Sequence, residues 1–150
     1  MVLGDYLNDE QKRLFILTKL KPGAVIYRFC DFTKPPKIKY LLVLQVQTDT
    51  VVFVINSEIN RFIQSKKCLR DAQIVIDQAS HSFLDYDSYI DCTDIEQIDT
   101  ACLVEEIMQD LNILKEPITA ELKVKVIATI LDSFTLSPSD IASLIASLSV

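Results

Sequence analysis

The sequence predicts an α+β fold in which a small, strongly bent antiparallel β-barrel is followed by a C-terminal helical segment. Short runs of branched and aromatic residues, separated by polar or proline-containing stretches, occupy much of residues 24–92. Apolar residues at helical spacing dominate residues 93–150. With 150 residues, 49% of them hydrophobic and 24% charged, the chain can build its own core and is not mostly disordered.

We therefore expect a single domain over residues 1–150. A short helix and the barrel would occupy residues 1–92, and a helical tail, packed on the barrel or on a second subunit, would occupy residues 93–150. No apolar run approaches the roughly 20 residues that a membrane span needs, so we expect no membrane segment.

The chain is expected to begin with a short amphipathic helix. Asn8 and Gln11 have the spacing of a capping box, and apolar residues recur from there to Leu20. Lys21-Pro22-Gly23 favours a turn, so the helix should end before it.

Three strands of a meander are expected next, at residues 24–30, 38–46 and 51–55. The first two are joined by a basic segment in which Pro35 and Pro36 cannot donate hydrogen bonds to a neighbouring strand. This segment is therefore predicted to be a hairpin loop. The third strand is almost entirely apolar, which favours burial on both of its faces.

A short helix and two further strands complete the predicted barrel. Residues 56–58 can start a helix, because apolar residues follow them at helical spacing. Alternating polar and branched residues then predict strands at residues 73–77 and 86–91.

Three helices are expected in the tail. Residues 93–96 have the form of a capping box for the first helix, which would end near residue 112. Thr119 and Ser137 are the expected N-caps of the second and third helices, the second running to about Ser133. The last helix is strongly apolar and needs a partner surface, which could be the barrel, the preceding helix or a second subunit.

Charge is distributed unevenly along the chain. Residues 21–70 contain nine basic and three acidic residues, whereas residues 71–122 contain thirteen acidic residues and one basic residue. This pattern predicts a basic and an acidic side within one domain. The basic side could contact phosphate, an acidic partner or a second copy, or the two regions could simply screen each other.

The N-terminus and the cysteines favour a cytoplasmic protein. The first ten residues are acidic, unlike the basic and then apolar start of a signal peptide. The four cysteines lie tens of residues apart, so we expect reduced and mostly buried thiols instead of a disulfide framework or a metal knuckle.

His81 is the only histidine and is followed by Asp85 and Asp87. Such a group could form an acid/base pair or part of a metal site. Asp87 and Ser88 also suit turns, where short polar side chains bond the nearby backbone. We expect no metal, because a zinc site would need two ligands besides His81 and Cys92 that no spacing shows. We expect no cofactor either, since with only Gly4 and Gly23 the chain has no glycine-rich phosphate loop.

Basic residues in the first half are the candidates for contact with RNA phosphates: Lys34, Lys37, Arg61, Lys66 and Lys67. Aromatic residues near the loop could stack on unpaired bases: Tyr27, Phe29, Phe32 and Tyr40. The alternative is that the lysines solvate the hairpin tip and the aromatic side chains form the barrel core.

Residues 21–92 resemble the PemK/MazF-like toxins. The resemblance rests on Lys21 to Ile26, the basic loop after it, Tyr40 to Gln45, and Val51 to Asn56. It implies an SH3-like barrel, a homodimer, metal-independent cleavage of single-stranded RNA, and a protein antitoxin as partner.

The chain departs from that family at two positions. Ala24 stands where the family has an acidic residue, and Lys39-Tyr40 stands where the second strand begins with Arg-Pro. Lys39 is the nearest substitute for the arginine, although lysine cannot make its bidentate contact with phosphate. Asn56-Ser57 falls near the hydroxyl residue at the end of the family's third strand. The helical tail is longer than the resemblance implies and could serve dimerisation or partner binding.

The sequence thus predicts a toxin-type endoribonuclease that acts by internal 2′-hydroxyl attack. Arg28 or Lys39 would stabilise charge on the phosphate, and Ser57 or His81 would transfer protons. The alternative is a noncatalytic protein-interaction module, in which the acidic face and the helical tail bind a partner. A third reading is a metal-dependent hydrolase centred on His81.

Overall fold

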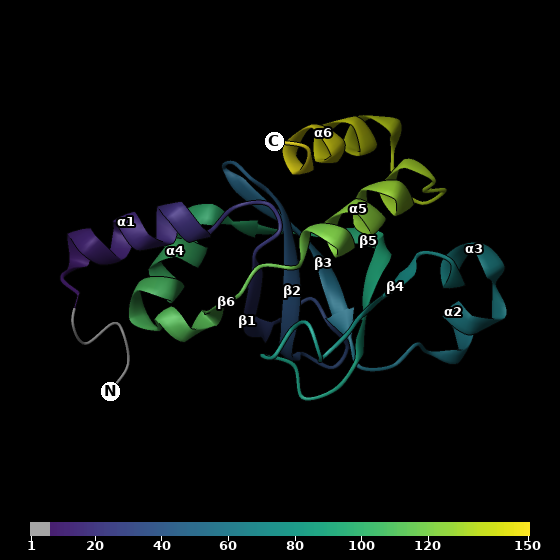
Figure 1. The fold of residues 1–150 in the computed structure, drawn as a ribbon, viewed down its shortest axis with the longest axis horizontal. Coiled ribbons are helices and arrows are strands. Elements are labelled where there is room, and N and C mark those ends of the chain that lie inside the picture. Colours follow the sequence, from purple (N-terminus) through teal and green to yellow (C-terminus); the bar gives the residue numbers. More distant parts are fainter. Residues whose placement is uncertain (1–6) are drawn as a thin grey trace.

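A computed structural model describes residues 7–150 and has a six-stranded antiparallel sheet at its centre (Figure 1). The order across the sheet is β4-β5-β3-β2-β1-β6. The strands are β1 (Val25–Cys30), β2 (Lys37–Val46), β3 (Asp49–Asn56), β4 (Gln73–Ile76), β5 (Ser88–Asp99) and β6 (Leu114–Lys115). The helices are α1 (Asp9–Lys19), α2 (Arg61–Ser65), α3 (Lys67–Arg70), α4 (Thr100–Gln109), α5 (Ala120–Leu131) and α6 (Pro138–Leu148), with a 3₁₀ turn at Leu111–Ile113.

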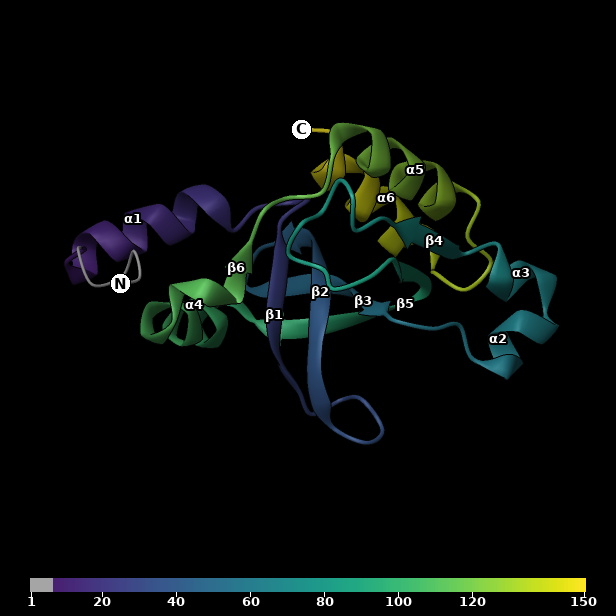
Figure 2. The ribbon, with the colours of Figure 1, turned by 60° about the horizontal axis from the view of Figure 1, so that its bottom comes forward.

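Helices cover both faces of this sheet. Helices α5 and α6 lie over one face and α1 and α4 over the other, which we call the α5/α6 face and the α1/α4 face (Figures 1 and 2). Successive side chains of β2 alternate between them: Leu42 and Leu44 join the α5/α6 core, and Leu41 and Val43 join the α1/α4 core. The predicted burial of both faces of the third strand is confirmed, because β3 also contributes to both cores.

The predicted meander is confirmed, since β1, β2 and β3 pair in sequence order. In the β1–β2 hairpin Tyr27 pairs with Tyr40 and Arg28 pairs with Lys39. The tyrosines and the two basic residues therefore point to opposite faces of the sheet. The loop between the strands extends beyond the sheet (Figure 2) and is held by Thr33, whose Oγ1 accepts a hydrogen bond from the Lys37 N–H at 3.2 Å.

The α+β class is confirmed, but the sheet is not closed into a barrel. Within residues 7–150 the sheet ends at β4 on one side and at β6 on the other, and these two strands do not pair. Helices bury both faces of the sheet, so its apolar residues are covered without the strands having to form a closed cylinder.

Strand β5 differs most from the sequence prediction. It was expected to end at Asp91 but continues to Asp99, so the capping box predicted at residues 93–96 is wrong. The true N-cap of α4 is Asp99, whose Oδ1 accepts a hydrogen bond from the Cys102 N–H at 2.9 Å. The helix then ends at Gln109, earlier than predicted.

Most other helix boundaries agree with the sequence. The Asn8 and Gln11 side chains form the predicted capping box, and Thr119 and Ser137 cap α5 and α6. The short helix after β3 begins later than predicted, because Asn60, and not residues 56–58, is the N-cap of α2.

The last helix finds its partner surface within the chain. Helix α6 packs against α5 and β2, and Leu144 and Leu148 belong to the core that they share. Gln45 on β2 adds a polar contact, because its Nε2 donates to Ser143 Oγ at 2.7 Å and to Ser147 Oγ at 2.9 Å. Of the surfaces considered for this helix, the sheet and the preceding helix are both used.

The thiols are less buried than expected: Cys30 and Cys92 are buried, whereas Cys68 and Cys102 are exposed. Burial raises the pKa of the Cys30 and Cys92 thiols. No helix within residues 7–150 is long and apolar enough to cross a membrane.

Candidate functional site

Three of the predicted phosphate-binding residues lie together where the β1–β2 loop enters β2. Lys34, Lys37 and Lys39 line a hollow of about 460 Å³, which we call the lysine hollow. Lys37 and Lys39 share a face because they are two residues apart on a strand. The other residues that line the lysine hollow are Thr33, Val54, Asn56, Ser57, Glu58, Asn60, Ile63 and Asp91.

Lys39 is the most constrained of these lysines. Its Nζ donates a hydrogen bond to Asn56 Oδ1 at 2.6 Å, across from β2 to the end of β3. Burial, followed by the nearby Lys37 ammonium, holds the pKa of Lys39 below its usual range. Ser57 directly follows Asn56 and is exposed, so the structure brings together the two positions that the family resemblance singled out.

Two carboxylates also line the lysine hollow, and they differ in whether their oxygens are already hydrogen-bonded within the fold. Asp91 is engaged, because its Oδ1 accepts hydrogen bonds from Gln73 Nε2 at 2.9 Å and from the Thr93 N–H at 3.0 Å. Glu58 is exposed at the rim. The sequence analysis did not select Glu58, although its position next to Ser57 was a signal that could have found it.

Arg28 lies opposite Lys39 but is engaged elsewhere. Its guanidinium forms a bidentate pair with Glu106 on α4, at 2.8 Å from Nη2 to Oε2 and 3.3 Å from Nε to Oε1. The Arg28 side chain is only 17% exposed. The Nε–Nη2 edge therefore docks α4 on the sheet, and Arg28 does not line the lysine hollow.

His81 is buried and both of its ring nitrogens have backbone partners. Nδ1 lies 2.9 Å from the Asp77 carbonyl oxygen, which can only accept a hydrogen bond, and Nε2 lies 3.3 Å from the Thr119 N–H, which can only donate. The ring therefore carries its proton on Nδ1 and holds the segment after β4 against the start of α5. His81 does not line the lysine hollow.

The aspartates after His81 separate into different roles. Asp87 Oδ1 accepts a hydrogen bond from the Gln78 N–H at 2.8 Å, so it links the two ends of the β4–β5 connection and does not form a local turn. Asp85 lines a different hollow, described below. Within residues 7–150, no three histidine, cysteine, aspartate or glutamate side chains gather in a group that could hold a metal ion.

The other predicted RNA-binding residues lie outside the lysine hollow. Arg61, Lys66 and Lys67 are exposed on α2 and α3, which extend from one end of the sheet (Figure 1). Lys67 pairs with Asp71 at 2.7 Å, and Lys66 Nζ lies 5.4 Å from the centre of the Phe62 ring.

A second hollow lies on the α5/α6 side of the same hairpin. It measures about 250 Å³, and we call it the tyrosine hollow because Tyr27, Tyr40 and Tyr86 line it. The Tyr27 and Tyr40 ring centres lie 4.2 Å apart, and the Tyr40 hydroxyl donates to the Phe83 carbonyl oxygen at 2.8 Å. The other residues that line it are Lys37, Ile38, Lys39, Ile55, Ser57, Leu84, Asp85 and Ser88.

The aromatic residues near the hairpin are only partly core residues. Tyr27 is 38% exposed, Phe29 57% and Tyr86 59%, whereas Tyr40 is half-buried. Phe32 packs against the α1/α4 core. Of the four aromatic residues selected from the sequence, Tyr27 and Phe29 therefore have rings open to solvent, and Tyr86 was missed.

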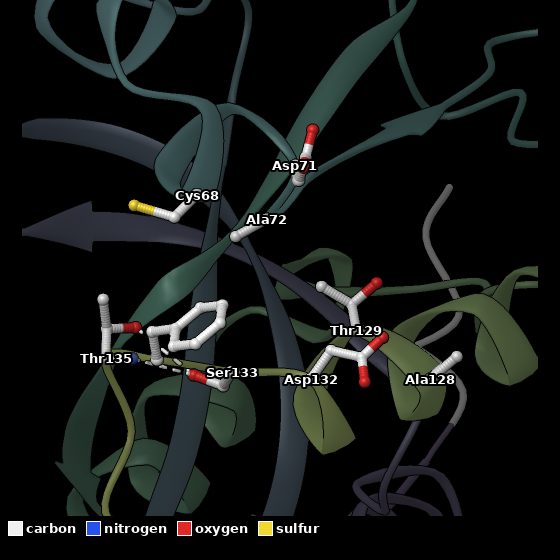
Figure 3. Close-up of a pocket in the computed structure, with 9 residues that line it drawn as sticks. Cys68, Asp71, Ala72, Ala128, Thr129, Asp132, Ser133 and Thr135 are labelled. Carbon is white, nitrogen blue, oxygen red and sulfur yellow. Dashed lines mark hydrogen bonds between the residues drawn. The ribbon is translucent and has the colours of Figure 1, made fainter.

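A third hollow, of about 380 Å³, lies between the α3–β4 connection and the C-terminal end of α5 (Figure 3). Its lining includes the carboxylates of Asp71 and Asp132 and the exposed Cys68, but no basic residue. This hollow therefore does not attract phosphate, unlike the lysine hollow.

No protein-family model, curated protein or solved structure matches the chain. A function is therefore supported here by the geometry of the hollows at the end of the hairpin.

Proposed function

We propose that the protein is a PemK/MazF-like toxin-type protein that binds single-stranded RNA at the lysine hollow and cleaves it without a metal ion. One observation carries the proposal: Lys39 and Ser57, from different strand ends, line the same hollow beside two further lysines. Clustered ammonium groups favour phosphate, and a nearby hydroxyl can hydrogen-bond it.

In the proposed reaction a ribose 2′-oxygen attacks the adjacent phosphorus to form a 2′,3′-cyclic phosphate, and the 5′-oxygen leaves and takes a proton from water. Lys39 stabilises the negative charge that develops on the phosphate oxygens. Glu58 accepts the 2′-hydroxyl proton, since it is the exposed carboxylate at the rim. Ser57 positions the phosphate. Arg28 and His81 have no part in this scheme, because their polar atoms are used within the fold.

The same resemblance extends the proposal to the fold and the setting. We regard β1 to β5 as the strands of an SH3-like barrel that is left open here by the covering helices. We expect a homodimer in the cytoplasm, with a protein antitoxin as its partner.

A noncatalytic interaction module is the second candidate. It is favoured by the engagement of two of the four predicted catalytic residues, Arg28 with Glu106 and His81 with backbone groups. In this reading the hairpin end binds without chemistry, or the acidic side binds a protein.

The test is incubation of purified protein with a mixed single-stranded RNA pool in EDTA. We expect cleavage by the parent, a loss of about 10²-fold or more in Lys39→Ala, and a loss of about 10²–10⁴-fold in Glu58→Gln. Lys125→Ala, which removes an exposed lysine on α5, is the matched control and should cleave like the parent. Arg28→Ala should keep its rate per folded molecule.

The result would also separate the two candidates. Absence of cleavage by the parent, with RNA binding that is weakened by Lys39→Ala, would leave a binding module without chemistry. Absence of both cleavage and binding would overturn the RNA proposal and favour a protein partner.

A further inference from the structure

The lysine hollow and the tyrosine hollow meet at one point. Lys37, Lys39 and Ser57 line both of them. These residues lie where the chain enters β2 and where it leaves β3, which are neighbouring strand ends at the same edge of the sheet. The two hollows thus form one continuous surface that passes from the α1/α4 face to the α5/α6 face around this edge.

The two sides of this surface differ in chemistry. The lysine hollow has three ammonium groups on its lining. The tyrosine hollow has three phenol rings, and Tyr86 and Tyr27 are 59% and 38% exposed. Tyr40, whose ring centre lies 4.2 Å from that of Tyr27, is fixed by its hydrogen bond to the Phe83 carbonyl oxygen.

A nucleotide has the same division, with an anionic phosphate on one side and a planar base on the other. Aromatic side chains bind unpaired bases by stacking, and clustered lysines bind the backbone. At about 250 Å³ the tyrosine hollow is smaller than pockets for drug-sized ligands, and so suits one ring system. Lys34 lines the lysine hollow alone, and Tyr27 and Tyr86 line the tyrosine hollow alone, which orients the nucleotide.

We propose that one nucleotide of a single-stranded RNA is held across this edge, with its phosphate in the lysine hollow and its base stacked on Tyr27 and Tyr86 in the tyrosine hollow. This inference rests on the proposed function and adds the base-binding subsite. It makes the ligand an unpaired base, because a base within a duplex has no free face to stack.

The test uses two fluorescently labelled oligonucleotides with 2′-O-methyl groups, which prevent attack by the 2′-oxygen. One carries bases throughout, and the other has abasic positions in its centre. We expect Tyr86→Ala to weaken binding of the first about 5- to 100-fold, as measured by fluorescence anisotropy, and to leave binding of the second unchanged. Tyr86→Phe, which keeps the ring, should bind like the parent. Lys39→Ala should weaken both.

Phe134→Ala is the matched control, because Phe134 is 88% exposed in the connection between α5 and α6. It should leave both affinities unchanged. A second readout is intrinsic fluorescence: the chain has five tyrosines and no tryptophan, so stacking on the tyrosine hollow should quench emission with the base-bearing oligonucleotide and not with inorganic phosphate.

The outcomes are distinct. If Tyr86→Ala weakens neither oligonucleotide while Lys39→Ala weakens both, the base-binding subsite is overturned and the proposed RNA site stands. Equal weakening of both oligonucleotides by Tyr86→Ala would overturn the subsite as well, since the ring would then not act through the base. If the parent binds neither oligonucleotide, both proposals fail.

Discussion

His81 shows how a residue that looks catalytic in a sequence can be structural. It is 2% exposed, and its two nitrogens bond the Asp77 carbonyl oxygen and the Thr119 N–H. Both partners are backbone groups that lose their hydrogen bonds if the ring is removed. The ring therefore links two segments that are far apart in the chain.

We expect His81→Ala to lower the free energy of unfolding by about 2–4 kcal/mol, from lost packing and two unpaired backbone groups. Denaturant unfolding measures this, with the exposed Ser82→Ala as control. RNA cleavage per folded molecule should not change. A variant that kept its stability and lost cleavage would instead make His81 part of the active site.

Lys39 gives a prediction in pH. Its pKa is lowered, chiefly by burial, so the folded chain binds this proton less tightly than the unfolded chain does. The ammonium form therefore disfavours folding at neutral pH; this cost begins to fall as pH rises above the lowered pKa and is gone above the ordinary pKa of lysine. Phosphate binding needs the ammonium form of Lys39, so the affinity for phosphate should fall as pH rises through the lowered pKa.

RNA affinity should accordingly begin to fall at a lower pH than an ordinary lysine would give. Anisotropy titrations with the 2′-O-methyl oligonucleotide from about pH 7 to about pH 10 would follow this. Lys39→Arg should move the fall to higher pH, since arginine stays charged. An identical pH profile in the two proteins would mean that Lys39 does not contact the phosphate.

The sequence predicts which site residues lie together only where they are close in the chain. Lys37 and Lys39 were both predicted to contact phosphate, but the second strand was expected to begin at residue 38; its start at Lys37 is what puts the two lysines on one face. The engagement of Arg28 did not follow from the sequence, because its partner Glu106 is on α4 and reaches Arg28 only through packing of that helix on the sheet.

At the scale of elements, β5 shows why a strand can be mistaken for the start of a helix. In its register with β3, the pair Val52 and Glu96 is followed by the pair Val54 and Asp91, so that one residue of β3 faces four residues of β5. The sequence prediction rested on residues 93–96, which have the form of a capping box. In the structure Ile95 packs on the α5/α6 core and Ile98 on the α1/α4 core, as residues three apart on a strand do. The pairing with β3 that keeps the segment extended is a nonlocal interaction, which no local motif reveals.

The two capping assignments can be compared directly by mutation. Asp99→Ala removes the side chain that accepts the Cys102 N–H and should lower the melting temperature by about 2–4 °C. Glu96→Ala removes the N3 side chain of the capping box predicted from the sequence; because this residue lies within β5, the melting temperature should change by less than about 1 °C. The opposite order of effects in a thermal melt would place the start of the helix at residues 93–96.

At the scale of the whole molecule, one sheet separates two apolar cores. Ile107 on α4 belongs to the core of the α1/α4 face, and Leu144 on α6 belongs to the core of the α5/α6 face. The strands between them contribute side chains to both cores. If the helices on one face came away, the apolar side chains on that face of the same strands would become exposed to solvent.

Unfolding should therefore occur in one transition whichever face is weakened. We expect Ile107→Ala and Leu144→Ala each to lower the free energy of unfolding by about 2–5 kcal/mol, with coincident transitions by circular dichroism and tyrosine fluorescence. Leu144→Ala should do so independently of protein concentration, because α6 packs within the chain. Two separated transitions would show that the faces unfold independently.

The order in which the covering helices occur along the chain has a consequence for synthesis on the ribosome. The meander β1–β3 is complete at Asn56, whereas α4 begins only at Thr100, after the 43 residues 57–99, and α5 and α6 follow later still. At about 5–20 residues per second those 43 residues take roughly 2–9 s to appear. During that interval the nascent meander presents apolar side chains on both of its faces, which makes it a substrate for the chaperones that meet chains at the ribosome.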